Sequence, residues 1–157
     1  MAFPNPYPAQ RWPSSAQDVV GLEFDWFACD ETGQLGVFTS AGSGFIPATV
    51  FASTEAPYNS VIAVLAIKGT VPAIQVFTGN GRYNDWLDFA TRGLFAYDFQ
   101  DVHRVHADER HGYDLIARPS VPISVLDLPP SLVHCLPVIP VVFGASNLVP
   151  LSILHDL

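Results

Sequence analysis

Residues 24–47 read FDWFACDETGQLGVFTSAGSGFIP, and they carry the strongest fold signal in the chain. Two runs of apolar, β-prone residues flank a turn at residues 30–33 (DETG), and the second run ends in the glycine-rich segment 41–44, ahead of Pro47. This order predicts a β-hairpin followed by a tight loop. We expect Gly33 to take a positive φ, since the turn must reverse the chain between two strands. The stretch carries no recognisable arrangement of nucleophile, base or metal ligands.

Working outward from the hairpin, apolar alternation predicts the other strands. Residues 19–29 place Phe24 and Trp26 on one face, and residues 35–40 are their hairpin partner. The alternation in residues 94–99 indicates a further strand. More extended segments are expected at residues 71–77 (a short strand or a link), 113–118 and 141–149.

Helix signals are fewer. Residues 84–93 (NDWLDFATRG) predict a compact helix, with Asn84 as N-cap and Gly93 as the left-handed residue that closes it. Residues 129–131 (PPS) open another short helix, and residues 59–68 (NSVIAVLAIK) favour a helix over a buried strand.

These elements indicate a single α+β domain, with a mostly antiparallel sheet and two or three short helices. We assign residues 1–18 to a proline-rich N-terminal arm and residues 19–157 to the domain, because four of the first thirteen residues are proline. No internal repeat and no linker divides the chain. A length of 157 residues is enough to bury a core without disulfides or metals.

The composition restricts the partners and the compartment. Fifteen acidic residues against seven basic ones give a formal net charge of −8. Such a chain repels phosphate backbones, so nucleic acid is not expected as a partner, whereas a basic protein surface is. No apolar run reaches the length of about 20 residues that a membrane-spanning helix needs, so we expect no membrane partner.

The compartment follows from the N-terminus and the cysteines. The first thirteen residues lack the basic and apolar regions of a secretory signal, so a cytoplasmic location is expected. Cys29 and Cys135 are interpreted as buried thiols in a reducing compartment, with a disulfide between them as the less favoured alternative.

The most polar window is residues 98–114, DFQDVHRVHADERHGYD. Its histidines, His103, His106 and His111, lie among carboxylates, which is the raw material of a metal site. The spacing matches no specific metal motif, and a solvated loop between two strands is the simpler interpretation. We therefore expect no cofactor and assign no metal ligand.

Other constellations point to structure more than to chemistry. The glycine loops at 42–44 and 79–82 match neither phosphate-binding motif, and turn chemistry explains both. Ser40 and Ser43 lack the nucleophile-elbow pattern, and Cys135 follows His134 directly, so on a helix their side chains would point apart. Catalysis is therefore not favoured, although it is not excluded.

Aromatic and acidic residues alternate where the strand at 94–99 enters the polar window, since Tyr97 and Phe99 alternate with Asp98. An aromatic face rimmed by acids would suit a protein interface, with the tyrosines as anchors and the acids steering association. The competing interpretation is the two faces of a half-buried strand. The residues assigned to partner binding are Tyr97, Asp98, Asp101, Asp108, Glu109, Tyr113 and Asp114.

The chain also resembles a family of small bacterial proteins with the motif D-x-x-G-x-[LIV]-x-x-F-[ST]-[ST]-[AG]-G-x-G followed by proline. The segments LFAYDF (94–99) and GYDLIARPSVPI (112–123) add to the likeness, which covers about half the chain. Members are similar to immunity proteins of polymorphic-toxin systems, which neutralise a cognate toxin by binding it. The motif carries no catalytic residue. Here it consists of Asp30, Gly33, Leu35, Phe38, Thr39, Ser40, Ala41, Gly42, Gly44 and Pro47.

The sequence therefore predicts a cytoplasmic partner-binding protein, an immunity-type inhibitor whose acidic surface docks a basic toxin domain. The alternative is a metal-dependent enzyme or ligand binder that uses His103, His106 and His111. A homo-oligomer with a buried apolar interface is compatible with either function, because only 14% of the residues are charged.

Overall fold

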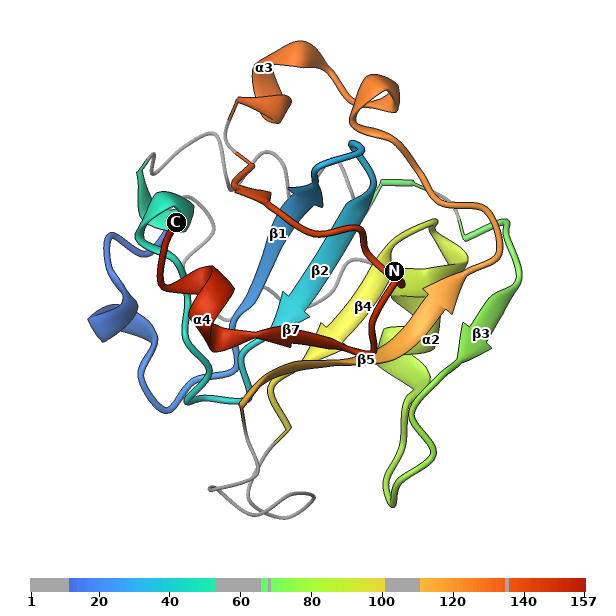
Figure 1. The fold of residues 1–157 in the computed structure, drawn as a ribbon, viewed down its shortest axis with the longest axis horizontal. Coiled ribbons are helices and arrows are strands. Elements are labelled where there is room, and N and C mark those ends of the chain that lie inside the picture. The colour runs from blue at the N-terminus through green and yellow to red at the C-terminus, as the bar shows by residue number, and fades with distance from the viewer. Residues whose placement is uncertain (1–11, 53–65, 68, 101–110, 135) are drawn as a thin grey trace.

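A single mixed β-sheet organises the protein (Figure 1). The computed structural model describes residues 12–52, 66–67, 69–100, 111–134 and 136–157. Within these residues seven strands form the sheet in the order β3-β5-β4-β2-β1-β6, and β7 pairs with β5. The strands are β1 (Asp25–Asp30), β2 (Leu35–Thr39), β3 (Ala73–Gln75), β4 (Phe95–Asp98), β5 (Gly112–Pro119), β6 (Val138–Ile139) and β7 (Leu148–Pro150).

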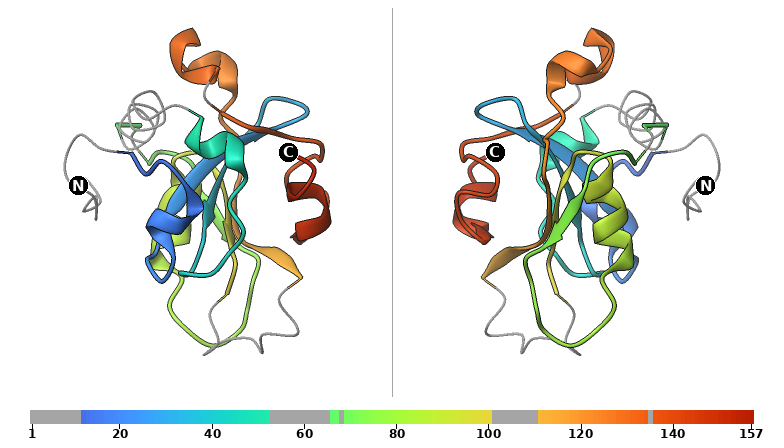
Figure 2. Two further views of the ribbon diagram at one scale, coloured as in Figure 1. Left: turned by 90° about the vertical axis from the view of Figure 1, so that its left-hand side faces the viewer. Right: turned by 90° about the vertical axis from the view of Figure 1, so that its right-hand side faces the viewer.

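Short helices cover the two faces of this sheet, so the predicted α+β class is confirmed. Helix α2 lies on one face and α4 on the other (Figure 2). Among the described residues no helix is long and apolar enough to cross a membrane. The helical elements are η1 (Ala16–Val19), η2 (Ala48–Phe51), α2 (Asn84–Thr91), η4 (Val125–Asp127), α3 (Pro130–Val133) and α4 (Leu151–Leu154).

The central strands β1, β2, β4 and β5 pair in both senses. β1 pairs with β2, and β4 with β5, in antiparallel ladders, as do β3 and β7 with β5. β2 and β4 run parallel, because the chain between them passes through α2 and returns to the end of the sheet where β2 began. β6 also runs parallel to β1. Antiparallel pairings thus predominate, and the parallel β2–β4 ladder lies at the centre of the sheet.

The hairpin that joins β1 to β2 forms as predicted. Gly33 has a φ of +86°, and its N–H donates to the Asp30 carbonyl (3.1 Å). The Asp30 carboxylate accepts hydrogen bonds from the backbone N–H groups of Thr32 and Gln34, both at 2.9 Å. A Cβ at Gly33 would also approach Val125 Cγ2 to 3.2 Å. The turn is therefore held by its own side chains and by η4 beside it.

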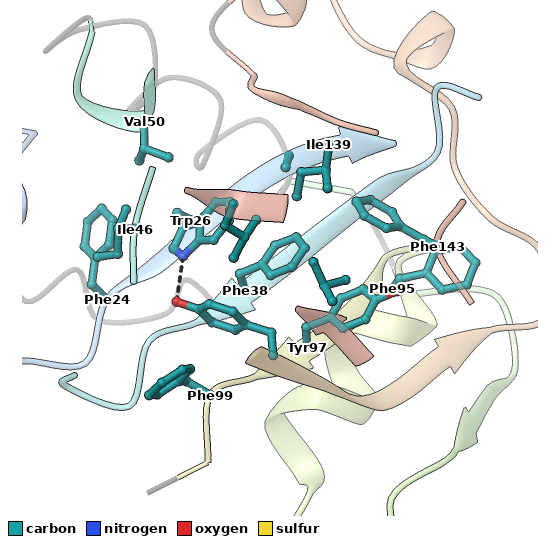
Figure 3. Packing of buried hydrophobic residues seen from close by; sticks show 14 of the residues in the cluster. Phe24, Trp26, Phe38, Ile46, Val50, Phe95, Tyr97, Phe99, Ile139 and Phe143 are labelled. Atoms are coloured by element: carbon teal, nitrogen blue, oxygen red, sulfur yellow. Dashed lines mark hydrogen bonds between the residues drawn. The ribbon is translucent and has the colours of Figure 1, made fainter. Parts of the chain in front are cut away.

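An aromatic core fills the face of the sheet that α4 covers (Figure 3). Phe38 stacks between Trp26 and Tyr97, with ring centroids 4.3 and 4.9 Å apart. Phe143 packs edge-on against Phe38 at 5.8 Å. Stacked and edge-to-face pairs of this kind each add about 0.5–1.5 kcal/mol beyond their buried area. The buried members of this core are Trp12, Val19, Phe24, Trp26, Ala28, Phe38, Ile46, Val50, Phe95, Tyr97, Phe99, Tyr113, Leu115, Ile139, Phe143, Val149 and Leu154.

A second, more aliphatic core lies under α2 on the other face. Phe89 and Ala90 of α2 pack here with Phe27 of β1 and Val37 of β2. The same strands thus bury side chains on both faces, which explains why 49% of the residues are apolar. The remaining buried members are Cys29, Leu35, Leu94, Ala96, Ala117, Leu128 and Leu136.

Two sequence predictions need adjustment. The predicted helix begins at Asn84, but Tyr83 occupies the N-cap position and makes no side-chain cap. Gly93 closes the helix with a φ of +93°, as predicted. The segment predicted as extended at 141–149 is mostly turns and bends up to residue 147. The strands lie on either side of these turns, at Val138–Ile139 and Leu148–Pro150.

The predicted proline-rich arm reaches the core. The Trp12 ring is buried against Phe24, at 5.0 Å between centroids, and its Nε1–H donates to the Val50 carbonyl at 3.0 Å. Residues 1–11 and most of the segment predicted as a helix at 59–68 lie outside the described residues.

Candidate functional site

Four polar side chains form a row across the central strands at one end of the sheet. Asp25 of β1 is in register with Thr39 of β2, Thr39 with Asp98 of β4, and Asp98 with Asp114 of β5. Residues paired in this way project from the same face of a sheet. Phe27 lies two residues from Asp25, and Val37 two residues from Thr39, so these side chains share one face of the sheet. Phe27 and Val37 pack under α2, so α2 covers the face that carries the row. We call Asp25, Thr39, Asp98 and Asp114 the acidic row.

Hydrogen bonds tie the middle of the acidic row to α2. Trp86 Nε1–H donates to Thr39 Oγ1 at 3.0 Å, and the Thr39 hydroxyl lies 2.6 Å from Asp98 Oδ1. The same hydroxyl lies 3.3 Å from the Tyr97 carbonyl oxygen. Asp98 itself is 2% exposed. A short hydrogen bond to a carboxylate is roughly twice as strong as one between neutral groups, so Thr39 fixes the position of the Asp98 side chain.

The electrostatics of the acidic row are dominated by burial and by like charge. The pKa of Asp25 is raised to about 7, mainly by burial and also by the nearby carboxylates of Glu23, Asp85 and Asp98. The pKa of Asp114 is raised by burial, although a hydrogen bond from the Gln100 side chain opposes that rise. Glu23 and Asp85 are exposed, which extends the negative charge to the surface.

Asp25 and Asp98 are too far apart to share a proton as a catalytic carboxylate pair, and the described residues contain no cluster of metal ligands. Asp25 and Asp98 lie two strands apart, which is about 10 Å at the usual spacing of neighbouring strands. Carboxylates that share a proton in aspartic proteases are about 3 Å apart. Within the described part of the chain no group of three or more His, Cys, Asp or Glu side chains could hold a metal ion. What the acidic row supplies is a concentrated negative potential.

The two tyrosines predicted as docking anchors lie in the core instead. Tyr97 is 1% exposed and Tyr113 is fully buried. The Tyr113 hydroxyl donates to the Phe45 carbonyl at 2.9 Å and accepts from Trp26 Nε1 at 3.3 Å, and Tyr97 Oη accepts from the Gly144 N–H at 3.2 Å. Burial raises the pKa of both hydroxyls. The prediction that Tyr97 and Tyr113 lie on an exposed aromatic face is therefore wrong. They belong to the strands β4 and β5, which are covered on both sides.

The acidic residues predicted for docking divide into two groups. Asp98 is buried and Asp114 is half-buried, so both belong to the acidic row. The remaining predicted residues, Asp101, Asp108, Glu109, His103 and His106, lie outside the described residues. His111 is exposed, and its carbonyl accepts a hydrogen bond from Leu151 N–H at 2.9 Å.

Sequence reasoning missed Asp25, Thr39 and Trp86 as members of one site. A signal was present in Asp25, a charged residue on the same alternation as the apolar Phe27. Buried strand positions rarely carry a lone carboxylate, so such a break in the pattern marks a candidate site. The link to Trp86 and Asp98 has no local signal, because both lie about 60 residues or more along the chain.

Other polar features of the fold have structural roles. Ser40 O accepts hydrogen bonds from the N–H groups of Ser43 and Gly44, and a Cβ at Gly44 would lie 2.6 Å from Tyr113 Oη. The glycine loop therefore serves close packing. Cys29 is a free, buried thiol, and burial raises its pKa, which makes it a poor nucleophile.

No known family model, curated protein or solved structure matches this chain. Its function is therefore inferred from its own residues, and the acidic row is the feature with the clearest electrostatic consequence.

Proposed function

We propose that this chain is a cytoplasmic, immunity-type protein that neutralises a bacterial toxin by binding a basic surface of it. The observation that carries the proposal is the cluster of carboxylates at Asp25, where burial together with the charges of Glu23, Asp85 and Asp98 raises the pKa to about 7. The net charge of −8 and the resemblance of residues 24–47 to immunity proteins support the same function.

The physical basis is a repulsion that a cationic partner relieves. Glu23 and Asp85 are exposed, whereas Asp25 and Trp86 are partly buried beside them. An Arg or Lys side chain placed here would meet several carboxylates beside the partly buried Trp86. Surface charge of one sign also accelerates the encounter with an oppositely charged protein.

Binding of a cation should also lower the pKa of Asp25. Near pH 7 part of the population carries a proton on this carboxyl, and the docked charge would expel it. Calorimetry of the complex in two buffers of different ionisation enthalpy measures that release. Binding with no proton release near neutral pH would contradict a docking site at Asp25.

The direct experiment uses the product of the neighbouring gene as the partner. We expect it to co-purify with this chain, and we expect expression of this chain to protect cells from it. The double variant Glu23→Lys/Asp85→Lys should weaken the complex and abolish protection. The matched control, Glu31→Lys/Asp156→Lys, changes the net charge equally at exposed positions that are not among the charges acting on Asp25, and it should keep both. Failure of the wild-type chain to bind or protect would remove the proposal.

The alternative function, a metal-dependent enzyme or ligand binder, stays a prediction. Two of its three histidines lie outside the described residues. Metal analysis of protein purified without chelators tests it, because a true site would carry near-stoichiometric metal that His103→Ala or His106→Ala removes.

A further inference from the structure

The loop between β3 and α2 presents an Asn–Gly pair to solvent. Asn80 and Gly81 are both exposed, and Gly81 has a φ of +125°. Tyr83 follows at the start of α2 and is 5% exposed. Its hydroxyl lies 2.8 Å from the Asn80 carbonyl oxygen and 2.9 Å from the Gly79 carbonyl oxygen. The main chain around Asn80 is thus held by a buried side chain, whereas the Asn80 side chain is exposed.

We propose that Asn80 is a site of spontaneous deamidation, promoted by the Tyr83 hydroxyl. The backbone nitrogen of Gly81 loses its proton to solvent and attacks Asn80 Cγ. A C–N bond forms, the side-chain nitrogen leaves as ammonia, and a five-membered succinimide results. Water then opens this ring at one of its two carbonyls, which leaves either aspartate or isoaspartate. Water is the only co-reactant, and no oxidant or reductant is needed.

Two features of the loop favour the attack. Gly81 has no Cβ, so its nitrogen can approach Asn80 Cγ without the steric barrier that any other residue would add. The Tyr83 hydroxyl donates to the carbonyl of the same peptide group that contains the attacking nitrogen. A hydrogen bond to that carbonyl draws electron density from the peptide and makes its N–H more acidic.

The position of the donor is fixed by packing. The Tyr83 ring lies against Phe77, at 5.8 Å between centroids, and against Trp86 at 6.0 Å. Burial of this ring keeps the hydroxyl directed at the loop, so the polarised peptide is a lasting feature of the folded state. In an unfolded chain this donor would be lost.

Two other exposed asparagines serve as internal comparisons. Asn147 precedes Leu148, whose branched side chain hinders attack by its nitrogen. Asn84 is the first residue of α2, so helical geometry constrains the following nitrogen. Conversion of Asn80 adds one negative charge to a chain of net charge −8, and isoaspartate also lengthens the main chain ahead of α2 by one carbon.

The experiment ages the intact chain at physiological temperature and follows tryptic peptides by mass spectrometry. Cleavage after Lys68 and Arg82 gives residues 69–82, in which Asn80 is the single asparagine. We expect this peptide to gain aspartate and isoaspartate several-fold faster than the peptides with Asn84 and Asn147, and faster in alkaline than in mildly acidic buffer. Conversion at Asn80 no faster than at Asn147 would overturn the proposal.

Tyr83→Phe tests the promoting hydroxyl. We expect the variant to deamidate several-fold more slowly than wild type in the folded state and at the same rate in concentrated urea, where the contact is absent. An unchanged or faster rate in the folded variant would refute the role of Tyr83. Thermal unfolding of both proteins reports whether the variant is folded, and Asn80→Gln provides the unreactive reference for the mass measurement.

Discussion

The two ends of strand β1 each carry an aspartate, and the two side chains are in opposite situations. Asp30 is 2% exposed, yet its pKa is lowered: burial alone would raise it, but hydrogen bonds outweigh burial. Asp25 also experiences burial, but its neighbours are the carboxylates of Glu23, Asp85 and Asp98, and its pKa rises to about 7. Burial raises the pKa of both groups, and the difference lies in the hydrogen-bond donors that reverse this rise at Asp30, whereas like charges add to it at Asp25.

The donors around Asp30 explain its behaviour. Its two oxygens accept from Thr32 N–H and Oγ1–H, from Gln34 N–H and Nε2–H, and from Phe143 N–H, all between 2.8 and 2.9 Å. The last of these joins the hairpin to a segment 113 residues away. Asp30 is thus a structural carboxylate, whereas Asp25 carries a charge that the fold does not neutralise well.

The largest expected effect is the loss of Asp30. Asp30→Ala should lower the free energy of unfolding by about 3 kcal/mol or more, because it leaves several partly or fully buried N–H donors without their charged acceptor. Chemical denaturation of this variant and of the control Asp25→Ala measures the difference. Equal destabilisation of the two variants would contradict the proposed difference between Asp30 and Asp25 in their contribution to stability.

The turn that orients Asp30 should be the next most sensitive position. Gly33→Val should destabilise the protein by about 1 kcal/mol or more, since a β-branched residue disfavours a φ of +86° and its Cβ would press on Val125. The midpoint of urea unfolding reports this change. The matched control is Gly21→Val, because Gly21 also has a positive φ, of +78°, but has open space around it. Gly36 is unsuitable as a control, since Phe143 packs on it.

A smaller effect of opposite sign is expected at Asp25. The pKa of Asp25 is raised in the folded state, so its ionisation opposes folding, and stability should fall as pH rises from about 4 to about 7. Asp25→Asn should remove that fall and raise the unfolding free energy above pH 7 by about 1 kcal/mol or more, because each unit of a pKa shift is worth about 1.4 kcal/mol. Asp30 acts in the other direction: its stabilisation should be lost only below about pH 4.

Denaturation curves measured across this pH range test both signs. A wild-type stability that rises from pH 4 to pH 7, with no change in Asp25→Asn, would contradict the assignment of Asp25 as the strained carboxyl.

The smallest effect on stability is expected in the polar window. Charge reversal of Asp101, Asp108 and Glu109 to lysine should change the unfolding free energy by less than about 0.5 kcal/mol, if these side chains are surface charges. The same changes should slow association with a basic partner and flatten its dependence on salt. Association kinetics at two ionic strengths test this, and a large loss of stability would show that the window is part of the core.

Local patterns account for much of the fold. The DETG turn, the helix closed by Gly93 and the strands at 94–99 and 113–118 were predictable, because turn chemistry and apolar alternation act over a few residues. The docking face was not: Tyr97 and Asp98 alternate as an amphipathic strand would, yet both faces of β4 are buried. Alternation shows that two faces differ, but only the layers packed on them show which face meets solvent.

By itself the sequence determined the hairpin, the α+β class and the acidic character of this protein, since each follows from residues close in the chain or from composition. Tertiary structure alone decided the acidic row. Thr39 meets Asp98 through a parallel pairing of strands 59 residues apart, and Asp85 reaches Asp25 only because α2 packs on that face. Register between distant strands depends on how all the buried faces fit together, and no local pattern encodes that fit.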